Sequence, residues 1–187
     1  MDIGDDQIIS VALVLALLLL SRVRDLLDNS GLFAATITGL TVSFLGHWTW
    51  LIALFIFLVI GSVATKWKLE EKKLLSLEEA NEGLRSWKNV LANGGAVSII
   101  AIYNFIFPGE EWIYFAAIAS ISVALSDTLA SEIGSLDTRT RSITTLQSVP
   151  AGTNGGMSPT GTVAALIGAI IISIIGVIFS PENSTIN

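Results

Sequence analysis

The chain has 187 residues, of which 52% are hydrophobic and only 14% are charged, whereas a soluble domain usually has about 25% charged residues. It contains no cysteine, which excludes disulfides, thiolate metal sites and cysteine nucleophiles, and its single histidine argues against a histidine-based metal site or catalytic triad. The net charge of −6 argues against a nucleic-acid partner. These values favour an integral membrane protein.

The apolar residues fall in blocks, and each block is apolar on all sides, which is typical of membrane-spanning helices. A β-barrel would need alternating polarity, and none is present. The sequence therefore predicts an all-α integral membrane protein with about six transmembrane helices. We expect these helices at 7–20, 31–45, 48–65, 92–107, 112–129 and 160–179.

The basic residues predict how the chain is oriented in the membrane. If the intervals between the blocks alternate between outside and inside, starting outside, all ten Lys and Arg residues fall on the inside. Because positive charge concentrates in cytoplasmic loops, both termini are predicted to lie outside. The chain then forms one membrane domain, 1–187, with an amphipathic cytoplasmic loop at 66–91 and a second cytoplasmic loop, containing the sequence motifs, at 130–159.

The 66–91 loop is rich in Lys, Glu and Leu. Its leucines, including Leu69, Leu74 and Leu84, form an amphipathic pattern that fits an interfacial helix or a helical hairpin. A solvated charged loop is the alternative. In either case the basic residues could bind the anionic lipid surface. Lys73 and Arg85 could instead bind the phosphates of a nucleotide.

The fifth predicted helix ends in Ser-Asp-Thr-Leu-Ala-Ser-Glu-Ile-Gly, residues 126–134. Asp127 lies at the edge of an apolar segment, where an ionisable side chain is costly and is therefore a functional candidate. Glu132 is offset from Asp127 by about 140° around a helix, and it reaches the same point only if the helix loosens at Ser131 or Gly134. Two carboxylates with neighbouring hydroxyls would form an oxygen site suited to Mg²⁺. The alternative is a polar helix end with packing residues.

Two glycine-containing segments are candidates for phosphate binding. The first is 150–162, in which Gly152, Thr153, Asn154, Gly155 and Gly156 precede a helix that we expect to begin at Pro159 with Ser158 as its cap. Successive backbone N–H groups in such a loop bind anions, although many glycine-rich loops are simply tight turns. The second is 90–95, where Asn93 can contact a phosphate or metal and Gly94 permits close approach of another backbone.

Small residues at four-residue steps mark one face of each of the last two predicted helices. They are Ala116, Ser120, Ala124 and Thr128 in one helix, and Gly161, Ala165, Ala169 and Ser173 in the other. Such faces let membrane helices approach closely. We therefore expect the two helices to pair, which would place Asp127 beside the loop at 152–156.

Three segments together resemble the DUF92-type integral membrane family that includes transmembrane protein 19 and the plant phytyl-phosphate kinase. They are 83–95 with its Leu-Ala-Asn-Gly-Gly, 126–134, and 152–161 with its Gly-Thr-Asn-Gly-Gly. The resemblance implies a kinase that converts a polyprenyl-type monophosphate, such as phytyl or geranylgeranyl phosphate, to the diphosphate. It also implies CTP or another nucleoside triphosphate as co-substrate, and Mg²⁺ as cofactor.

Under this resemblance Asp127 and Glu132 are the metal and nucleotide ligands, and Lys73 and Arg85 stabilise charge. Asn93, Thr153 and Asn154 contact phosphate, beside Gly94, Gly152, Gly155 and Gly156. The partners would be the lipid phosphate, the nucleotide and membrane lipids. Members of the family continue with further helices beyond the glycine loop, so self-association is one way to complete the site. The alternatives are a CTP-dependent lipid cytidylyltransferase, a transporter and a non-catalytic scaffold.

Overall fold

The computed structural model describes residues 4–75 and 84–180. These residues form seven α-helices, a five-residue π-helix and a two-stranded antiparallel sheet. In chain order the elements are α1 (Asp5–Val23), α2 (Asn29–Thr41), η1 (Val42–Gly46), α3 (Trp48–Lys66), α4 (Leu69–Leu74), α5 (Trp87–Ile106), α6 (Trp112–Gly134), β1 (Arg141–Ser142), β2 (Gly156–Met157) and α7 (Pro159–Ile178).

Five of these helices, α1, α3, α5, α6 and α7, are long and apolar enough to cross a membrane. The all-α membrane fold is therefore confirmed, but the count of six spans is not. The block at 31–45 forms α2, which has only 13 residues, and then η1. At 1.5 Å per residue, α2 alone is shorter than the hydrocarbon core of a bilayer.

Three helices extend by several residues beyond their predicted ranges, and α1 is the first, with Asp5–Val23 in place of 7–20. α5 begins at Trp87 rather than at residue 92, because Ser86 and Asn89 form a capping box at its start. α6 continues to Gly134 rather than ending at residue 129. The motif at 126–134 is therefore entirely helical, and the following loop runs from 135 to 158.

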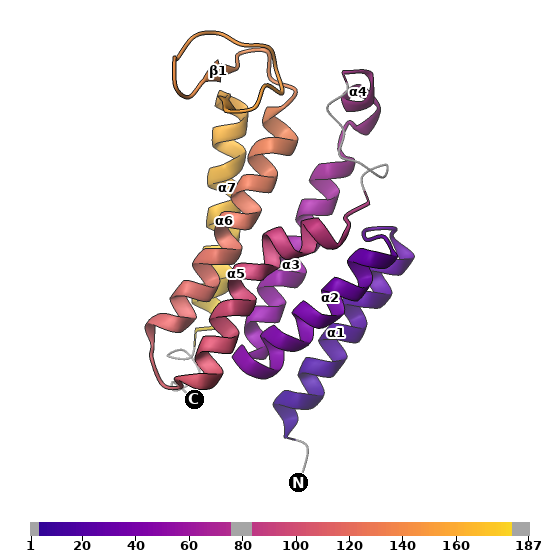
Figure 1. The fold of residues 1–187 in the computed structure, drawn as a ribbon, viewed down its shortest axis with the longest axis vertical. Helices are drawn as coiled ribbons and strands as arrows, with labels where there is room; N and C mark the ends of the chain where they lie inside the picture. Colours follow the sequence, from indigo (N-terminus) through magenta and orange to yellow (C-terminus); the bar gives the residue numbers. More distant parts are fainter. Residues whose placement is uncertain (1–3, 76–83, 181–187) are drawn as a thin grey trace.

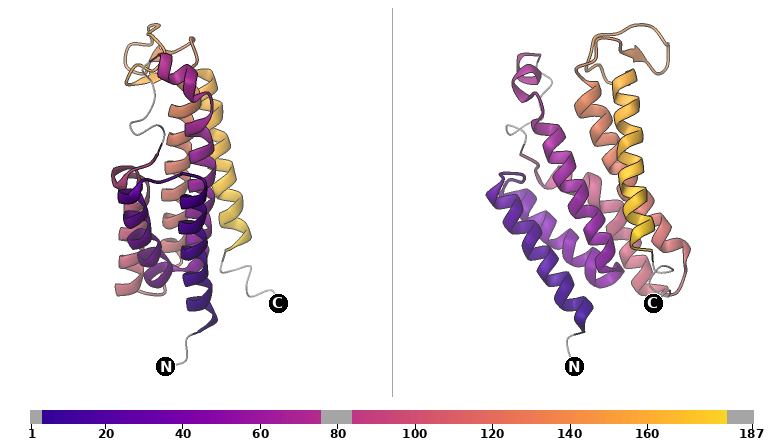
Figure 2. Two further views of the ribbon diagram at one scale, coloured as in Figure 1. Left: turned by 90° about the vertical axis from the view of Figure 1, so that its right-hand side faces the viewer. Right: turned by 180° about the vertical axis from the view of Figure 1, so that it is seen from behind.

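The helices form a bundle in which α3 and α5 lie between the α1–α2 pair and the α6–α7 pair (Figures 1 and 2). α3 is the most buried of the five long helices, whereas α1, α5 and α7 expose most of their apolar side chains. This exposure suits helices that face lipid. At one end of the bundle lie α4 and the 135–158 loop, and at the other lie the start of α1 and the end of α7 (Figure 1).

α6 and α7 pack along their length, and at three points a glycine of α7 lies directly against α6. A Cβ on Gly168 would lie 3.1 Å from backbone atoms of Leu125 and Ser126, and a Cβ on Gly161 would lie 3.0 Å from the carbonyl oxygen of Ala130. A Cβ on Gly176 would meet the side chain of Ile118. The predicted pairing of these two helices is thus confirmed.

The face of α7 that contacts α6 differs in detail from the predicted stripe. Its buried residues are Gly161, Ala164, Gly168, Ile172 and Gly176, whereas Ser173 is exposed. A helix turns once every 3.6 residues, so a row of strict four-residue steps drifts away from a straight interface. α7 begins as expected, with Pro159 in its first turn and the Ser158 hydroxyl accepting a hydrogen bond from the N–H of Gly161.

Candidate functional site: a cleft at the end of helices α6 and α7

A cleft of about 560 Å³ lies where the last turns of α6 meet the 135–158 loop and the first turns of α7. Its size is within the usual range for small-molecule sites. Asp127 and Ser131 line it from α6, and Thr162 lines it from α7. The loop contributes Ser135, Gly152, Thr153, Asn154, Gly155 and Gly156. The expected proximity of Asp127 to the glycine loop is therefore confirmed.

The glycine loop has a defined conformation that only its glycines adopt easily. Gly152 and Gly155 have φ angles of 77° and 74°, in the left-handed region. The N–H groups of Thr153 and Gly156 close the turn by donating to the carbonyls of Pro150 and Thr153. Within the described chain, the N–H groups of Asn154 and Gly155 make no hydrogen bond. Two successive free donors beside a cleft are what an anion-binding nest requires.

Asp137 fixes this loop to the start of α7. Its Oδ2 accepts hydrogen bonds from the Thr160 hydroxyl at 2.8 Å and from the Thr160 N–H at 3.3 Å. The guanidinium and backbone N–H of Arg139 donate to the same carboxylate. The Arg139 donors, followed by those of Thr160, hold the pKa of Asp137 well below its usual range. Sequence reasoning missed Asp137, and the Asp-x-Arg pattern directly after the end of α6 was the available signal.

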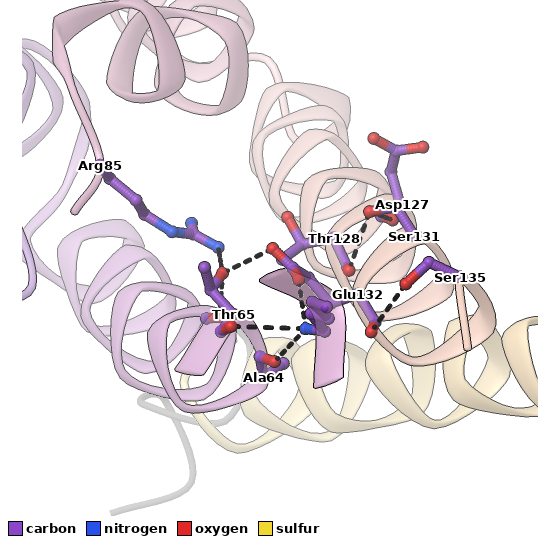
Figure 3. A network of polar contacts seen from close by, with 10 residues as sticks. Ala64, Thr65, Arg85, Asp127, Thr128, Ser131, Glu132 and Ser135 are labelled. Atoms are coloured by element: carbon purple, nitrogen blue, oxygen red, sulfur yellow. Dashed lines mark hydrogen bonds and ion pairs between the residues drawn. The ribbon is translucent and has the colours of Figure 1, made fainter. Parts of the chain in front are cut away.

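A second polar cluster lies on the opposite side of α6 and is buried (Figure 3). Lys72 of α4 forms an ion pair with Glu132 of α6, with 2.6 Å between Nζ and Oε2. The Thr65 hydroxyl of α3 donates to Oε1 of Glu132 at 2.8 Å, and a guanidinium nitrogen of Arg85 lies 3.3 Å from the same hydroxyl. Lys72 also donates to the carbonyl oxygens of Ala64 and Thr65. The cluster joins α3, α4, α6 and the start of α5.

The predicted site residues are therefore divided between different places. Asp127 is exposed and points away from Glu132, because α6 stays helical through Ser131 and keeps the two carboxylates on different faces (Figure 3). Lys73 lies at the surface, paired with Glu70 at 3.1 Å, and its neighbour Lys72 is the buried lysine. Arg85 joins the buried cluster rather than the cleft.

Asn93 and Gly94 of α5 are not among the residues that line the cleft. The Asn93 amide donates to the Asn89 carbonyl of its own helix. Gly94 is buried where α5 meets α2, and a Cβ there would lie 2.7 Å from Cγ2 of Thr38. In this structure the observed role of Gly94 is close packing between the two helices.

The cleft is suited to Mg²⁺ only as part of a complex with phosphate. In the described ranges, 4–75 and 84–180, no three Asp, Glu or His side chains converge as a metal site. Asp127 is the one carboxylate of the cleft, and hydroxyl and amide oxygens surround it. Mg²⁺ is commonly held by one or two carboxylates together with substrate phosphates and water, and Asp127 fits that arrangement. Glu132 does not, because Lys72 and Thr65 already occupy its oxygens.

Comparison with known proteins identifies relatives along most of the chain. An uncharacterized membrane protein of Methanocaldococcus jannaschii is 34% identical over 169 residues, which cover 90% of this chain and 69% of the relative. The chloroplastic protein VTE6 of Arabidopsis thaliana is 31% identical over 156 residues, covering 80% and 46%. The protein PGR of the same plant is 30% identical over 170 residues, covering 83% and 59%. The chain thus spans about half to two thirds of the length of these relatives.

No solved structure matches the chain. The model of the family described as integral membrane protein DUF92 matches residues 12–186, which include all three motifs from which the resemblance was inferred. Its match covers the cleft, the buried cluster, four of the five long helices in full and α1 from residue 12. The chain therefore belongs to the DUF92 family of integral membrane proteins.

Proposed function

We propose that this protein is a kinase that transfers a phosphoryl group from a nucleoside triphosphate to a polyprenyl-type monophosphate at the membrane surface. The observation that supports this most directly is the cleft, where the Asp127 carboxylate lies beside a glycine loop with two free backbone N–H donors. The resemblance to the family of the plant phytyl-phosphate kinase indicates phytyl or geranylgeranyl phosphate as acceptor and CTP as donor.

The reaction needs positioning and charge neutralisation more than it needs a nucleophilic side chain. An oxygen of the acceptor phosphate forms the new bond to the γ-phosphorus, the bond between that phosphorus and the nucleoside diphosphate breaks, and the products are the lipid diphosphate and the nucleoside diphosphate. Because the attacking oxygen is already ionised, no proton must be removed. This agrees with a cleft that contains no histidine.

The residues of the cleft have separate roles in this proposal. The N–H groups of Asn154 and Gly155 hold phosphate oxygens. Asp127 holds Mg²⁺, which when bound neutralises charge on the nucleotide phosphates. The prenyl chain lies along the apolar faces of the helices, with its phosphate at the membrane surface.

The test is turnover of the purified protein with geranylgeranyl or phytyl monophosphate, Mg²⁺ and labelled CTP. The wild type should release CDP and form the lipid diphosphate, and Asp127→Asn should reduce the rate by about 100-fold, as the loss of one main electrostatic group does elsewhere. Asp25→Asn, which makes the same charge change in an exposed turn, should keep the wild-type rate. Unchanged turnover of Asp127→Asn would remove Asp127 from the mechanism, and release of pyrophosphate would show a cytidylyltransferase.

A further inference from the structure

A second groove, of about 500 Å³, lies between α1 and α3, away from the cleft of the proposed kinase. Its walls are apolar, and its basic residues, Arg24 and Lys66, belong to the ends of α1 and α3. None of its lining residues lines the cleft beside Asp127. The full lining is Leu20, Arg24, Leu26, Val59, Ser62, Val63, Lys66 and Trp67.

The two cations are available to an anion. Lys66 donates to the carbonyl oxygens of Arg24 and Asp25 at 2.8 and 2.7 Å, which leaves the third donor of its ammonium group free. Arg24 is exposed, and in the described part of the chain its guanidinium forms no ion pair or hydrogen bond. Both cations are therefore free to approach a phosphate bound in the groove.

A buried polar group in the same groove has no partner. Ser62 is 1% exposed, and its hydroxyl makes no hydrogen bond to any described residue. The buried hydroxyl of Ser21 in α1, by contrast, donates to the carbonyl oxygen of Leu17, one turn earlier. Leaving a buried hydroxyl unpaired costs about 1 to 3 kcal/mol, so a group that could accept from Ser62 would be stabilising.

The apolar walls indicate that the ligand has hydrocarbon chains. Val63 and Trp67 line the groove and are 65% and 44% exposed, so it opens to the side on which lipid packs around α3. A tryptophan near the end of a spanning helix is typical of the membrane interface, where headgroups lie. Basic pockets between helices at this depth bind lipid headgroups.

We propose that the groove between α1 and α3 binds one anionic phospholipid of the surrounding membrane. Its phosphate is held by Arg24 and Lys66, an ester oxygen accepts from the Ser62 hydroxyl, and a chain lies against Val59 and Val63. This lipid would join the ends of α1 and α3, whose direct polar link is the Lys66 ammonium. The site does not depend on the proposed kinase activity.

Native mass spectrometry of the full chain tests the proposal, with equal amounts of phosphatidylglycerol and phosphatidylcholine that have the same acyl chains. One phosphatidylglycerol should stay bound in preference to phosphatidylcholine, and Arg24→Gln should weaken its binding about fivefold. Arg22→Gln is the matched control, because Arg22 lies on the same helix end but does not line the groove. Ser62→Ala, which removes only the unpaired hydroxyl, should also weaken binding.

Equal retention of the two lipids would overturn the proposal. So would an equal loss in the Arg22→Gln and Arg24→Gln variants, because that result would indicate a diffuse surface charge rather than a site. Displacement of the bound lipid by inorganic phosphate would show an anion site that makes no use of the apolar walls. Arg24 is exposed, so Arg24→Gln should leave the thermal unfolding midpoint of the delipidated protein unchanged.

Discussion

Glu132 and Lys72 form a buried ion pair whose two charges compensate each other. Glu132→Gln would leave the Lys72 ammonium among the carbonyls of Ala64 and Thr65 without its counter-charge. Removing one partner of a buried pair typically costs about 3 to 5 kcal/mol, whereas replacing both can be nearly neutral. We expect Glu132→Gln to unfold at a lower temperature in detergent than the double variant Lys72→Met/Glu132→Gln.

Glu71→Gln is the control for this pair, because Glu71 bonds Lys68 at the surface and such pairs contribute at most about 1 kcal/mol. If Glu132 is instead a metal ligand, as its motif suggests, Glu132→Gln should lose activity and keep its stability. A double variant that is less stable than Glu132→Gln would contradict the compensation of charges. The two roles of Glu132 are thus separable by measuring unfolding and turnover on the same preparations.

Asp137 makes the stability of the glycine loop depend on pH. Its pKa is lowered in the folded protein by the Arg139 and Thr160 donors, so its carboxylate stabilises the loop above its unfolded pKa of about 4, and this contribution is lost as the pH falls toward the folded pKa. Asp137→Asn should therefore increase hydrogen exchange in residues 135–158 at pH 7. The difference from wild type should shrink below pH 4. A difference that is the same at both pH values would contradict this role.

The positions of individual site residues could be predicted from the sequence only in part. The small-residue faces of the last two helices predicted that Asp127 lies near the glycine loop, and that is confirmed, because the loop is joined to α7 and α7 packs on α6. The choice of Lys73 over Lys72 was not decidable, since consecutive residues of a helix point about 100° apart and the sequence does not fix how α4 is rotated. The location of Glu132 required knowing that α6 does not unwind.

The contact between α6 and α7 is the element-scale feature that shapes the cleft. Gly168→Ala places a methyl group 3.1 Å from the backbone of Leu125 and Ser126, which cannot move aside as a side chain can. Gly95→Ala, in the middle of α5, meets nothing within 4 Å and gains the same helix propensity. We expect Gly168→Ala to be less stable than Gly95→Ala by about 1 to 3 kcal/mol, as measured by unfolding in detergent.

If the two alanine variants are equally stable, α6 and α7 can separate slightly without cost, and the close approach does not determine the cleft.

Hydropathy predicted most of the long helices, because each is apolar on all sides. It could not predict that 31–45 divides into α2 and η1, or that α1, α5 and α6 extend beyond their apolar blocks. Those boundaries depend on capping residues and tertiary contacts, to which hydropathy is insensitive.

At the scale of the whole molecule, every basic residue lies in one set of helix ends and connections. They are the end of α1 with the α1–α2 turn, the segment from the end of α3 to the start of α5, and the α6–α7 loop. These connections lie toward the same end of the bundle, opposite the α5–α6 turn (Figure 1). The distribution of charge in the sequence and the arrangement of the helices therefore agree. Together they favour an orientation in which the cleft faces the cytoplasm.

The chain contains no cysteine, so single cysteines can report this orientation in intact cells. Thr144 lies in the α6–α7 loop and Glu110 in the α5–α6 turn, and both are exposed. We expect Glu110→Cys to react with a membrane-impermeant maleimide from outside, and Thr144→Cys to react only after the membrane is permeabilised. The reverse pattern would place the cleft and all ten basic residues outside, away from cytosolic nucleotides, and would contradict both the orientation and the proposed kinase. Reaction of both positions in intact cells would show that α6, which lies between them, does not cross the membrane.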